Sequence, residues 1–164
     1  MMDLYIHWQK IKQVFLQAQV SSMYCSVASV DEQGQPHITP IGTVFLNNDQ
    51  TGYFFDTYTC QLSKNLIKQP KVCIMAVNTA KRFWLKSLIL GKFSTLPAIR
   101  LYGEIGALRP ATSEEIASVQ QRIKLLKWTK GSRLIWSDFT HVRDIQFTKA
   151  HPARYPHMMP DGIE

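Results

Sequence analysis

The sequence predicts a mainly β fold of the α+β kind, an antiparallel β-barrel with flanking helices. Short segments rich in β-branched residues alternate with polar turns, which is the pattern of strands joined by hairpins. No Gly-x-Gly-x-x-Gly or Walker sequence occurs, so nothing indicates a parallel βαβ fold. Closing the sheet into a barrel would hide the strand edges that otherwise pair with other chains.

A helix is predicted at the N-terminus, over residues 1–20, because apolar residues recur there at three- and four-residue steps. Three strands are predicted to follow it, separated by two polar turns. The second of them contains Pro40 and Gly42, so we expect it to be an edge strand or to carry a bulge. The three strands are Tyr24–Val30, His37–Leu46 and Tyr53–Thr57.

The second half of the chain contains two further predicted helices. The first, Cys60–Lys68, must end before Pro70, whose ring disfavours helical geometry in the preceding residue. The second opens at Thr112, where Thr-Ser-Glu-Glu fits a capping box. Its apolar face consists of Ile116, Val119, Ile123 and Leu126. The remaining strands are Lys71–Val77, Ala98–Leu108 with bulges at Gly103 and Gly106, and Val142–Phe147.

The composition is that of one globular domain, residues 1–164, in which residues 148–164 form a C-terminal tail. Hydrophobic residues make up 45% of the chain and charged residues 19%, which argues against disorder. The segment Met1–Lys10 has no apolar signal-peptide core, and no apolar run is long enough to span a bilayer, so we expect a cytoplasmic protein. Three cysteines without a Cys-x-x-Cys pair predict buried free thiols. They are Cys25, Cys60 and Cys73.

The formal net charge of +7 favours anionic partners. The basic residues are scattered, however, and no arginine-rich tract or nucleic-acid motif occurs. A solvated basic surface is therefore predicted rather than nucleic-acid binding. The five histidines lack the spacing of a metal site, so no metal ligands are predicted. No Ser-His-Asp arrangement can be argued, and the sequence identifies no catalytic residue.

The basic amphipathic segment Lys81–Lys92 has two interpretations. In the first, a helix or loop packs Phe83, Trp84, Leu88 and Ile89 against the barrel or a second subunit. In the second, the segment docks on a membrane surface or a partner, with Trp84 at the interface. The first is favoured because one such turn binds membranes weakly, and no membrane partner is expected.

One stretch of the chain resembles a known family. It reads SVASVDEQGQPHITPIGTVFL, followed by GYFFDT and LSKNLIKQPKVCIMAV, and it is similar to the opening of the FMN-binding split-barrel families of the pyridoxamine 5′-phosphate oxidase-like type. The later RLYGEIG and VRDIQF resemble the next and the final strand of these families. The resemblance implies an antiparallel split β-barrel and a homodimer. It also implies a small-molecule ligand, FMN, in a groove between the subunits.

The resemblance further implies where FMN would bind. The family holds the FMN phosphate with an Arg-Lys pair on the short helix, and those two positions hold Gln61 and Leu62 here. Two charge-assisted hydrogen bonds are lost, although small donors remain around the helix N-terminus, which suits an anion. A polar turn that only caps the helix is the alternative. The flavin ring would lie between two strand ends, largely against backbone groups. The implied cofactor-binding residues are Ile41, Thr43, Phe55, Asp56, Thr57, Thr59, Gln61, Ser63 and Lys64.

A substrate-binding arginine is implied near the C-terminus. The sequence PARYP places Arg154 where the vitamin B6 oxidases have an arginine that grips the substrate. Those enzymes continue with His-Asp, whereas Tyr155-Pro156-His157 follows here, and this difference argues against true pyridoxamine 5′-phosphate oxidase activity. An exposed arginine in a tail is the alternative.

These observations predict an FMN-binding oxidoreductase that acts on a small anionic or aromatic substrate. FMN would carry the electron chemistry, so no protein nucleophile or metal is needed. One alternative is a non-catalytic flavin or haem binding protein of the same fold. The other is a module whose basic face docks an acidic partner.

Overall fold

The structure, a computed structural model, describes residues 2–57, 59–124 and 139–160. These residues form four helices and seven strands. The helices are α1 (Leu4–Ser22), α2 (Cys60–Lys68), α3 (Lys81–Leu90) and α4 (Ser113–Ile123). The strands are β1 (Cys25–Val30), β2 (Pro36–Ile41), β3 (Val44–Leu46), β4 (Thr51–Phe55), β5 (Lys71–Val77), β6 (Ala98–Pro110) and β7 (His141–Pro152).

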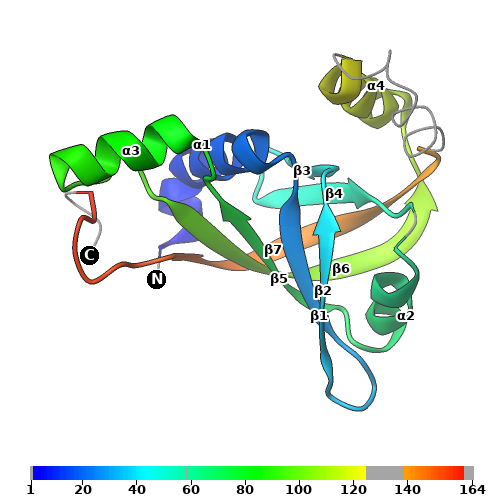
Figure 1. Cartoon of the computed structure of the whole chain (residues 1–164). Helices are drawn as coiled ribbons and strands as arrows, with labels where there is room; N and C mark the ends of the chain where they lie inside the picture. The colour runs from blue at the N-terminus through cyan, green and yellow to red at the C-terminus, as the bar shows by residue number, and fades with distance from the viewer. Residues whose placement is uncertain (1, 58, 125–138, 161–164) are drawn as a thin grey trace.

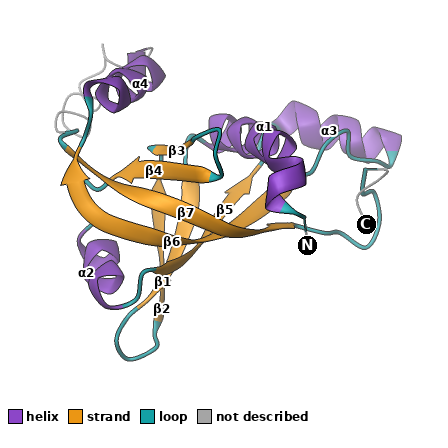
Figure 2. Cartoon of the chain, turned by 180° about the vertical axis from the view of Figure 1, so that it is seen from behind, coloured by secondary structure: helices purple, strands orange, loops and turns teal. Residues whose placement is uncertain are grey.

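The seven strands form one sheet with the order β2-β1-β5-β6-β7-β4-β3, in which every neighbouring pair is antiparallel. The sheet curls strongly (Figures 1 and 2). Its two edge strands, β2 and β3, are consecutive in the chain and are separated only by Gly42 and Thr43. This curled half-barrel with four helices confirms the predicted antiparallel split β-barrel.

Strand β2 lies at an edge of the sheet, as its proline and glycine predict. Pro36 and Pro40 stand near its two ends and cannot donate to a further strand, which is tolerated at an edge. The predicted strand His37–Leu46 is divided in two at Gly42. A Cβ atom on Gly42 would lie 2.9 Å from the Met23 carbonyl oxygen, so the chain can turn here only without a side chain.

Both bulges predicted in β6 are present. The pairing of β6 with β7 shifts between Tyr102 and Gly103, and again between Ile105 and Leu108. At the first shift, a Cβ atom on Gly103 would lie 2.7 Å from the Gln146 carbonyl oxygen. The two glycines therefore allow β6 to bend with the curl of the sheet.

The main core lies between helix α1 and strands β5, β6 and β7, which α1 contacts. Trp8, Ile11 and Phe15 of α1 are buried, as their spacing predicts. A smaller apolar cluster lies under α4 and contains Tyr53, Phe55, Val119 and Val142. Helix α4 begins with the predicted capping box of Thr112 and Glu115. Leu126, predicted on the same face, lies outside the described residues.

Two sequence predictions are wrong in part. The C-terminal tail does not begin at residue 148, because β7 continues to Pro152, which pairs with Ile99 of β6. The free thiols are not all buried: Cys25 is, Cys73 is half-buried and Cys60 is exposed. None of the helices in the described ranges has the length and apolar character needed to cross a membrane.

Helix α3 packs only some of the residues that the favoured interpretation placed against the barrel or a second subunit. Phe83 and Trp84 pack inward, and the Trp84 indole N–H donates to the Asn78 carbonyl at 2.6 Å. Leu88 and Ile89, which the favoured interpretation also placed in a contact, are exposed on this chain. Trp84 is therefore an anchor of α3 and does not lie at an outer interface.

Candidate anion site at the start of helix α2

A cluster of polar side chains gathers where β4 ends and α2 begins. Strand β4 ends at Phe55, Asp56 follows it, and the helix starts after Thr59. The side chain of Thr59, the N-cap residue, makes no capping hydrogen bond. The amides of the first turn of a helix carry partial positive charge and attract anions. The predicted anion site therefore depends on the residues of this junction.

Asp56 is the centre of the cluster. Its carboxylate accepts hydrogen bonds from the Arg143 Nε at 2.6 Å, from the Ser63 hydroxyl at 2.6 Å and from the Thr59 hydroxyl. The hydroxyl oxygens of Thr59 and Ser63 are 3.1 Å apart. The side chains of Asp56 and Arg143 are 5% and 10% exposed, so this is a buried ion pair with two hydroxyl donors around it.

Arg143 reaches the cluster because β7 pairs with β4, with Arg143 opposite Phe54. Its Nη1 also donates to the Gly106 carbonyl at 3.3 Å, which ties the ion pair to the second bulge of β6. A cation and a carboxylate that are 87 residues apart in the chain thus meet inside the sheet. Arg143 was not predicted from the sequence as a site residue.

The pKa of Asp56 reflects two opposing effects. Burial acts to raise it, but the hydrogen bonds from Ser63, Thr59 and Arg143, together with the charge of Arg143, lower it below its usual value. The carboxylate is therefore ionised at neutral pH, and its charge is balanced by that of Arg143.

Two of the implied phosphate ligands on α2 point elsewhere. The Gln61 amide donates to the Asn65 side chain at 2.8 Å, and Asn65 in turn donates to the Ser29 hydroxyl of β1 at 2.9 Å. Lys64 is exposed on the helix, and Thr57 is half-buried between β4 and α2. The structure therefore brings together Asp56, Thr59 and Ser63 and leaves Gln61 and Lys64 outside the cluster.

Leu62 occupies the position at which the resemblance implies a lysine. Its side chain is 0% exposed and belongs to the main core, together with Leu66 one turn later. This face of the helix therefore packs into the core. A cation placed there would have its charge buried.

The second wall implied for the flavin ring, around residues 41–43, packs against and hydrogen-bonds to other parts of the chain. Ile41 is buried in the main core and Thr43 is half-buried. The Gly42 carbonyl accepts from the Gln19 amide at 3.3 Å and from Arg122 of α4 at 3.0 Å. Both side chains also donate to the carbonyl of the first β3 residue. These carbonyls therefore stabilise the strand switch, and Arg122 is a second cation that the sequence analysis missed.

The other wall implied for the flavin ring includes Phe55, which packs into the small cluster under α4. Its ring lies 6.1 Å from that of Tyr53 and 5.1 Å from that of Phe139, both edge to face. Arg122 lies over the neighbouring Phe45 ring, 3.7 Å from its centroid. Phe55 and Ile41 thus belong to different clusters.

Arg154 lies far from α2 within one chain. It is exposed and follows β7, next to Tyr155, whose ring contacts Trp84 of α3 and Phe93. Helices α2 and α3 lie at opposite ends of the molecule in both views (Figures 1 and 2). A single chain therefore does not bring the implied substrate arginine to the α2 cluster.

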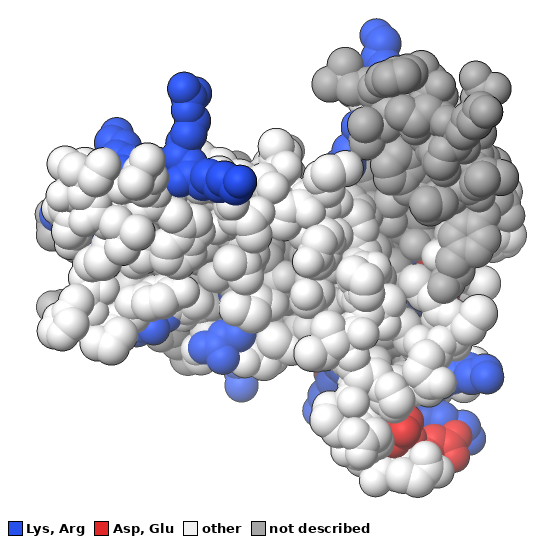
Figure 3. All heavy atoms as spheres, in the orientation of Figure 1, with Lys and Arg blue, Asp and Glu red and all other residues white. Residues whose placement is uncertain are grey.

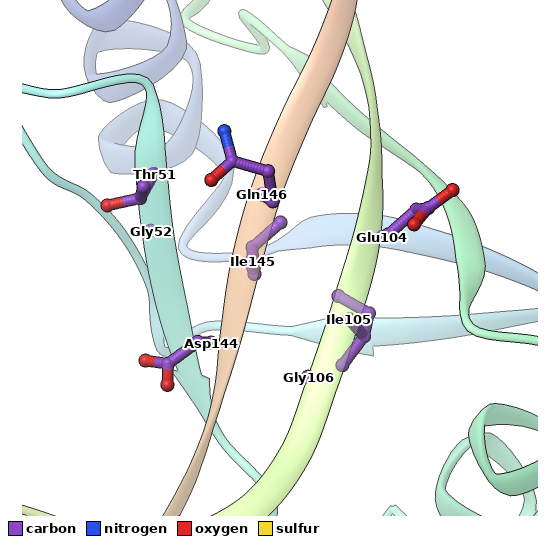
Figure 4. A pocket seen from close by; sticks show the side chains of 8 residues that line it. All are labelled: Thr51, Gly52, Glu104, Ile105, Gly106, Asp144, Ile145 and Gln146. Carbon is purple, nitrogen blue, oxygen red and sulfur yellow. The ribbon is translucent and has the colours of Figure 1, made fainter.

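A hollow of about 360 Å³ crosses strands β4, β7 and β6 (Figure 4). Its lining includes the carboxylates of Glu104 and Asp144, which point to opposite sides in this view, and it includes no Lys or Arg. Asp144 is itself held by Arg109, at 2.5 and 2.7 Å. This hollow lacks the positive charge that a phosphate needs, so the α2 cluster is the better anion site.

The sequence model of the family described as pyridoxamine 5′-phosphate oxidase matches residues 9–146. The chain belongs to this family. The match spans the whole sheet except the end of β7, and it includes the α2 cluster with Asp56 and Arg143. No curated protein sequence matches the chain.

Solved structures of the same fold come from several bacteria. An FMN-binding protein from Syntrophomonas wolfei is 14% identical with a TM-score of 0.64, and the alignment covers 93% of this chain and 92% of that one. HupZ from Group A Streptococcus is 16% identical with a TM-score of 0.56, covering 93% and 94%. The heme storage protein HutZ from Vibrio cholerae is 15% identical with a TM-score of 0.52, covering 92% and 95%. At these identities the similarity concerns the fold.

Proposed function

We propose that this protein is a cytoplasmic, homodimeric FMN-binding oxidoreductase of the pyridoxamine 5′-phosphate oxidase-related group, acting on a small anionic or aromatic substrate. The observation that carries the proposal is the cluster of the buried Arg143 with the half-buried Thr59 and Ser63 at the start of α2, where no side chain caps the helix. Family membership and the fold shared with an FMN-binding protein support it.

The donors in this cluster are of the kind that a phosphate group requires. A helix N-terminus offers backbone N–H groups and a favourable dipole, hydroxyls add short hydrogen bonds, and a guanidinium adds charge. Arg143 of β7 would supply the positive charge that Gln61 and Leu62 do not supply on α2. When bound, FMN would provide the electron transfer chemistry, and the protein would provide binding and orientation.

Asp56 limits this site. Its carboxylate holds the Thr59 and Ser63 hydroxyls and the Arg143 Nε, so a phosphate must compete with it for the same donors. Two negative charges that share one set of donors repel each other. We therefore expect an FMN affinity that is lower than the donor set alone would give.

The proposed homodimer follows from the position of Arg154. In one chain this arginine precedes Tyr155, whose ring contacts Trp84 of α3, and α3 lies at the opposite end of the molecule from α2 (Figure 1). A substrate held by Arg154 could reach a flavin at α2 only if the two belonged to different subunits. Arg154 is therefore proposed to bind the substrate's negative charge at the partner's flavin.

A non-catalytic binding protein for flavin or haem is the second candidate. Two observations favour it: Arg143 is already neutralised by Asp56, so the cluster has no net positive charge for the FMN phosphate, and the fold is shared with the heme storage protein HutZ. A protein that stores a ligand needs no further chemical groups beyond those that hold it.

Reconstitution tests the proposal. The purified protein is incubated in parallel with FMN and with haem, passed through a desalting column, and its absorbance is recorded. Retained absorbance at roughly 450 nm, bleached by a reduced nicotinamide donor, is the expected result for a flavin oxidoreductase. Retention of haem alone, at roughly 400 nm, would replace it with the binding-protein function. A protein that retains neither cofactor would contradict both.

A further inference from the structure

Helix α3 is held firmly against the body of the molecule by one face. The Phe83 ring stacks on Phe93 at 5.7 Å, and the Trp84 ring meets Phe93 edge to face at 5.4 Å. Ser87, one turn further on, is buried and donates to the Phe83 carbonyl at 2.8 Å. Gly91 ends the helix in the left-handed conformation, with φ +62°. These contacts fix which side of α3 faces outward.

The outward face of α3 carries exposed aliphatic side chains. A helix turns 100° per residue, so Leu85 and Ile89 point away from the buried Ser87 and lie side by side. Leu85 is 62% exposed, Leu88 64% and Ile89 75%. Single exposed aliphatic residues are ordinary, but here Leu90 adds a fourth within ten residues. No described part of the chain covers them.

Cations surround these aliphatic side chains. Lys81, Arg82 and Lys86 are exposed on the same helix, which contains no acidic residue. Between residues 57 and 103 the chain carries eight Lys and Arg and no Asp or Glu. The formal charge of this segment alone therefore exceeds the net charge of the whole protein, which is +7. Lys and Arg side chains project over α3 in Figure 3, whereas the acidic side chains that this view shows most plainly lie at the opposite end.

We propose that the outer face of α3, formed by Leu85, Leu88, Ile89, Lys81, Arg82 and Lys86, docks on an anionic lipid membrane surface. Aliphatic side chains that project together with cations at the same level match the boundary between acyl chains and anionic headgroups. A second copy meeting this face symmetrically would bring like charges together. A nucleic acid would leave the aliphatic side chains without a partner.

Within one chain, a membrane under α3 does not cover the start of α2, because the two helices lie at opposite ends of the molecule in Figures 1 and 2. The inference uses no residue of the α2 cluster. Three aliphatic side chains on a short helix predict weak, reversible binding rather than permanent anchoring.

The test is co-sedimentation of the full chain with vesicles. Neutral phosphatidylcholine vesicles are compared with vesicles that also contain phosphatidylglycerol, at about 0.15 M salt. The protein should partition to the anionic vesicles and not to the neutral ones. Arg82→Gln with Lys86→Gln should lower the partition constant by about 25-fold, since each cation near such a surface contributes about fivefold. Leu85→Ser with Ile89→Ser should lower it at least roughly tenfold.

Matched control variants remove the same kinds of side chain, exposed cations and exposed aliphatic residues, from positions outside α3. Lys64→Gln with Lys71→Gln removes two exposed cations, and Ile38→Ser with Ile67→Ser removes two side chains that are each 73% exposed. Both controls should bind anionic vesicles like the original protein. Equal binding to neutral vesicles, no binding, or equal losses in the controls would overturn the proposal. A change of sedimentation mass in the Leu85/Ile89 variant would overturn it in favour of a subunit interface.

Discussion

Helices α2 and α3 differ in which side chains they bury, although they are similar in other respects. They have nine and ten residues, they precede and follow β5, and neither contains an acidic residue. Helix α2 turns Ser63 and Asn65 inward, where each finds a hydrogen-bond partner. Helix α3 turns Leu85 and Ile89 outward, where no described residue covers them. The first helix therefore builds an internal polar site, and the second offers an external surface.

The difference has consequences for stability. In the described residues, no buried side-chain nitrogen or oxygen lacks a hydrogen-bond partner. Removing a polar group at α2 would leave its partners buried and unsatisfied, which is costly. Removing an exposed side chain from α3 would change little in the free energy of folding. Substitutions in α2 should therefore lower the free energy of unfolding much more than substitutions on the outer face of α3.

The largest expected effect is that of Leu62→Lys. The Leu62 side chain is fully buried, so the substitution removes its packing and buries an ammonium group. We expect the free energy of unfolding to fall by about 4 kcal/mol or more, with no gain in FMN affinity. Urea denaturation measures the first and flavin fluorescence the second. Ile67→Lys, at a 73% exposed position of the same helix, is the control and should unfold like the original protein.

Arg143→Gln should have the next largest effect on stability. It leaves the Asp56 carboxylate buried without its cation, and breaking a buried pair in this way costs about 3 kcal/mol or more. Lys149→Gln removes an exposed cation from the same strand and should cost less than about 0.5 kcal/mol. If the two variants unfold at the same urea concentration, the ion pair does not stabilise the fold.

A smaller effect is expected for Asp56→Asn, in how the free energy of unfolding changes at acid pH. The pKa of Asp56 is lowered by folding, so its ionisation stabilises the native state above the unfolded pKa and ceases to do so as the pH falls through the folded pKa. Asp56→Asn should be less stable than the original protein at neutral pH. The two curves of unfolding free energy against pH should converge below about pH 4. Parallel curves would show that Asp56 is not the group involved.

The smallest effect is expected for Leu85→Ser with Ile89→Ser in α3. Because both side chains are exposed, the midpoint of urea unfolding should move by less than the equivalent of about 0.5 kcal/mol. A loss comparable with that of Leu62→Lys would remove the contrast between the two helices. It would mean that the outer face of α3 is buried in the protein as it exists in solution.

The sequence predicted most of the fold because its signals are local. Pro70 ends α2, and Thr112 and Glu115 cap α4. Gly103 indicates a bulge in β6 whichever strands lie beside it. The division of α3 into an inner and an outer face was not predicted. Phe83, Leu85, Leu88 and Ile89 are all apolar, and only the packed rings of Phe93 and Tyr155 decide which of them are covered.

The candidate site was predicted in part for the same reason. Thr59 and Ser63 are local to the helix N-terminus, and the resemblance drew attention to them. Arg143 joins them only through the pairing of β7 with β4, which no local pattern specifies. One signal was available and was not used: in a strand, Arg143 is in phase with the inward-facing Ile145 and Phe147, and this alternation predicts an arginine that faces the core.

The measurement that tests the central claim most directly is the ratio of the affinities for FMN and riboflavin, which differ only by the phosphate. If the α2 cluster binds that phosphate, the original protein should prefer FMN by roughly tenfold, an energy of about 1.4 kcal/mol. Arg143→Gln should abolish the preference, and Asp56→Asn should increase it, because the competing carboxylate is gone. Equal affinities for the two flavins, or a ratio that neither substitution changes, would contradict the account.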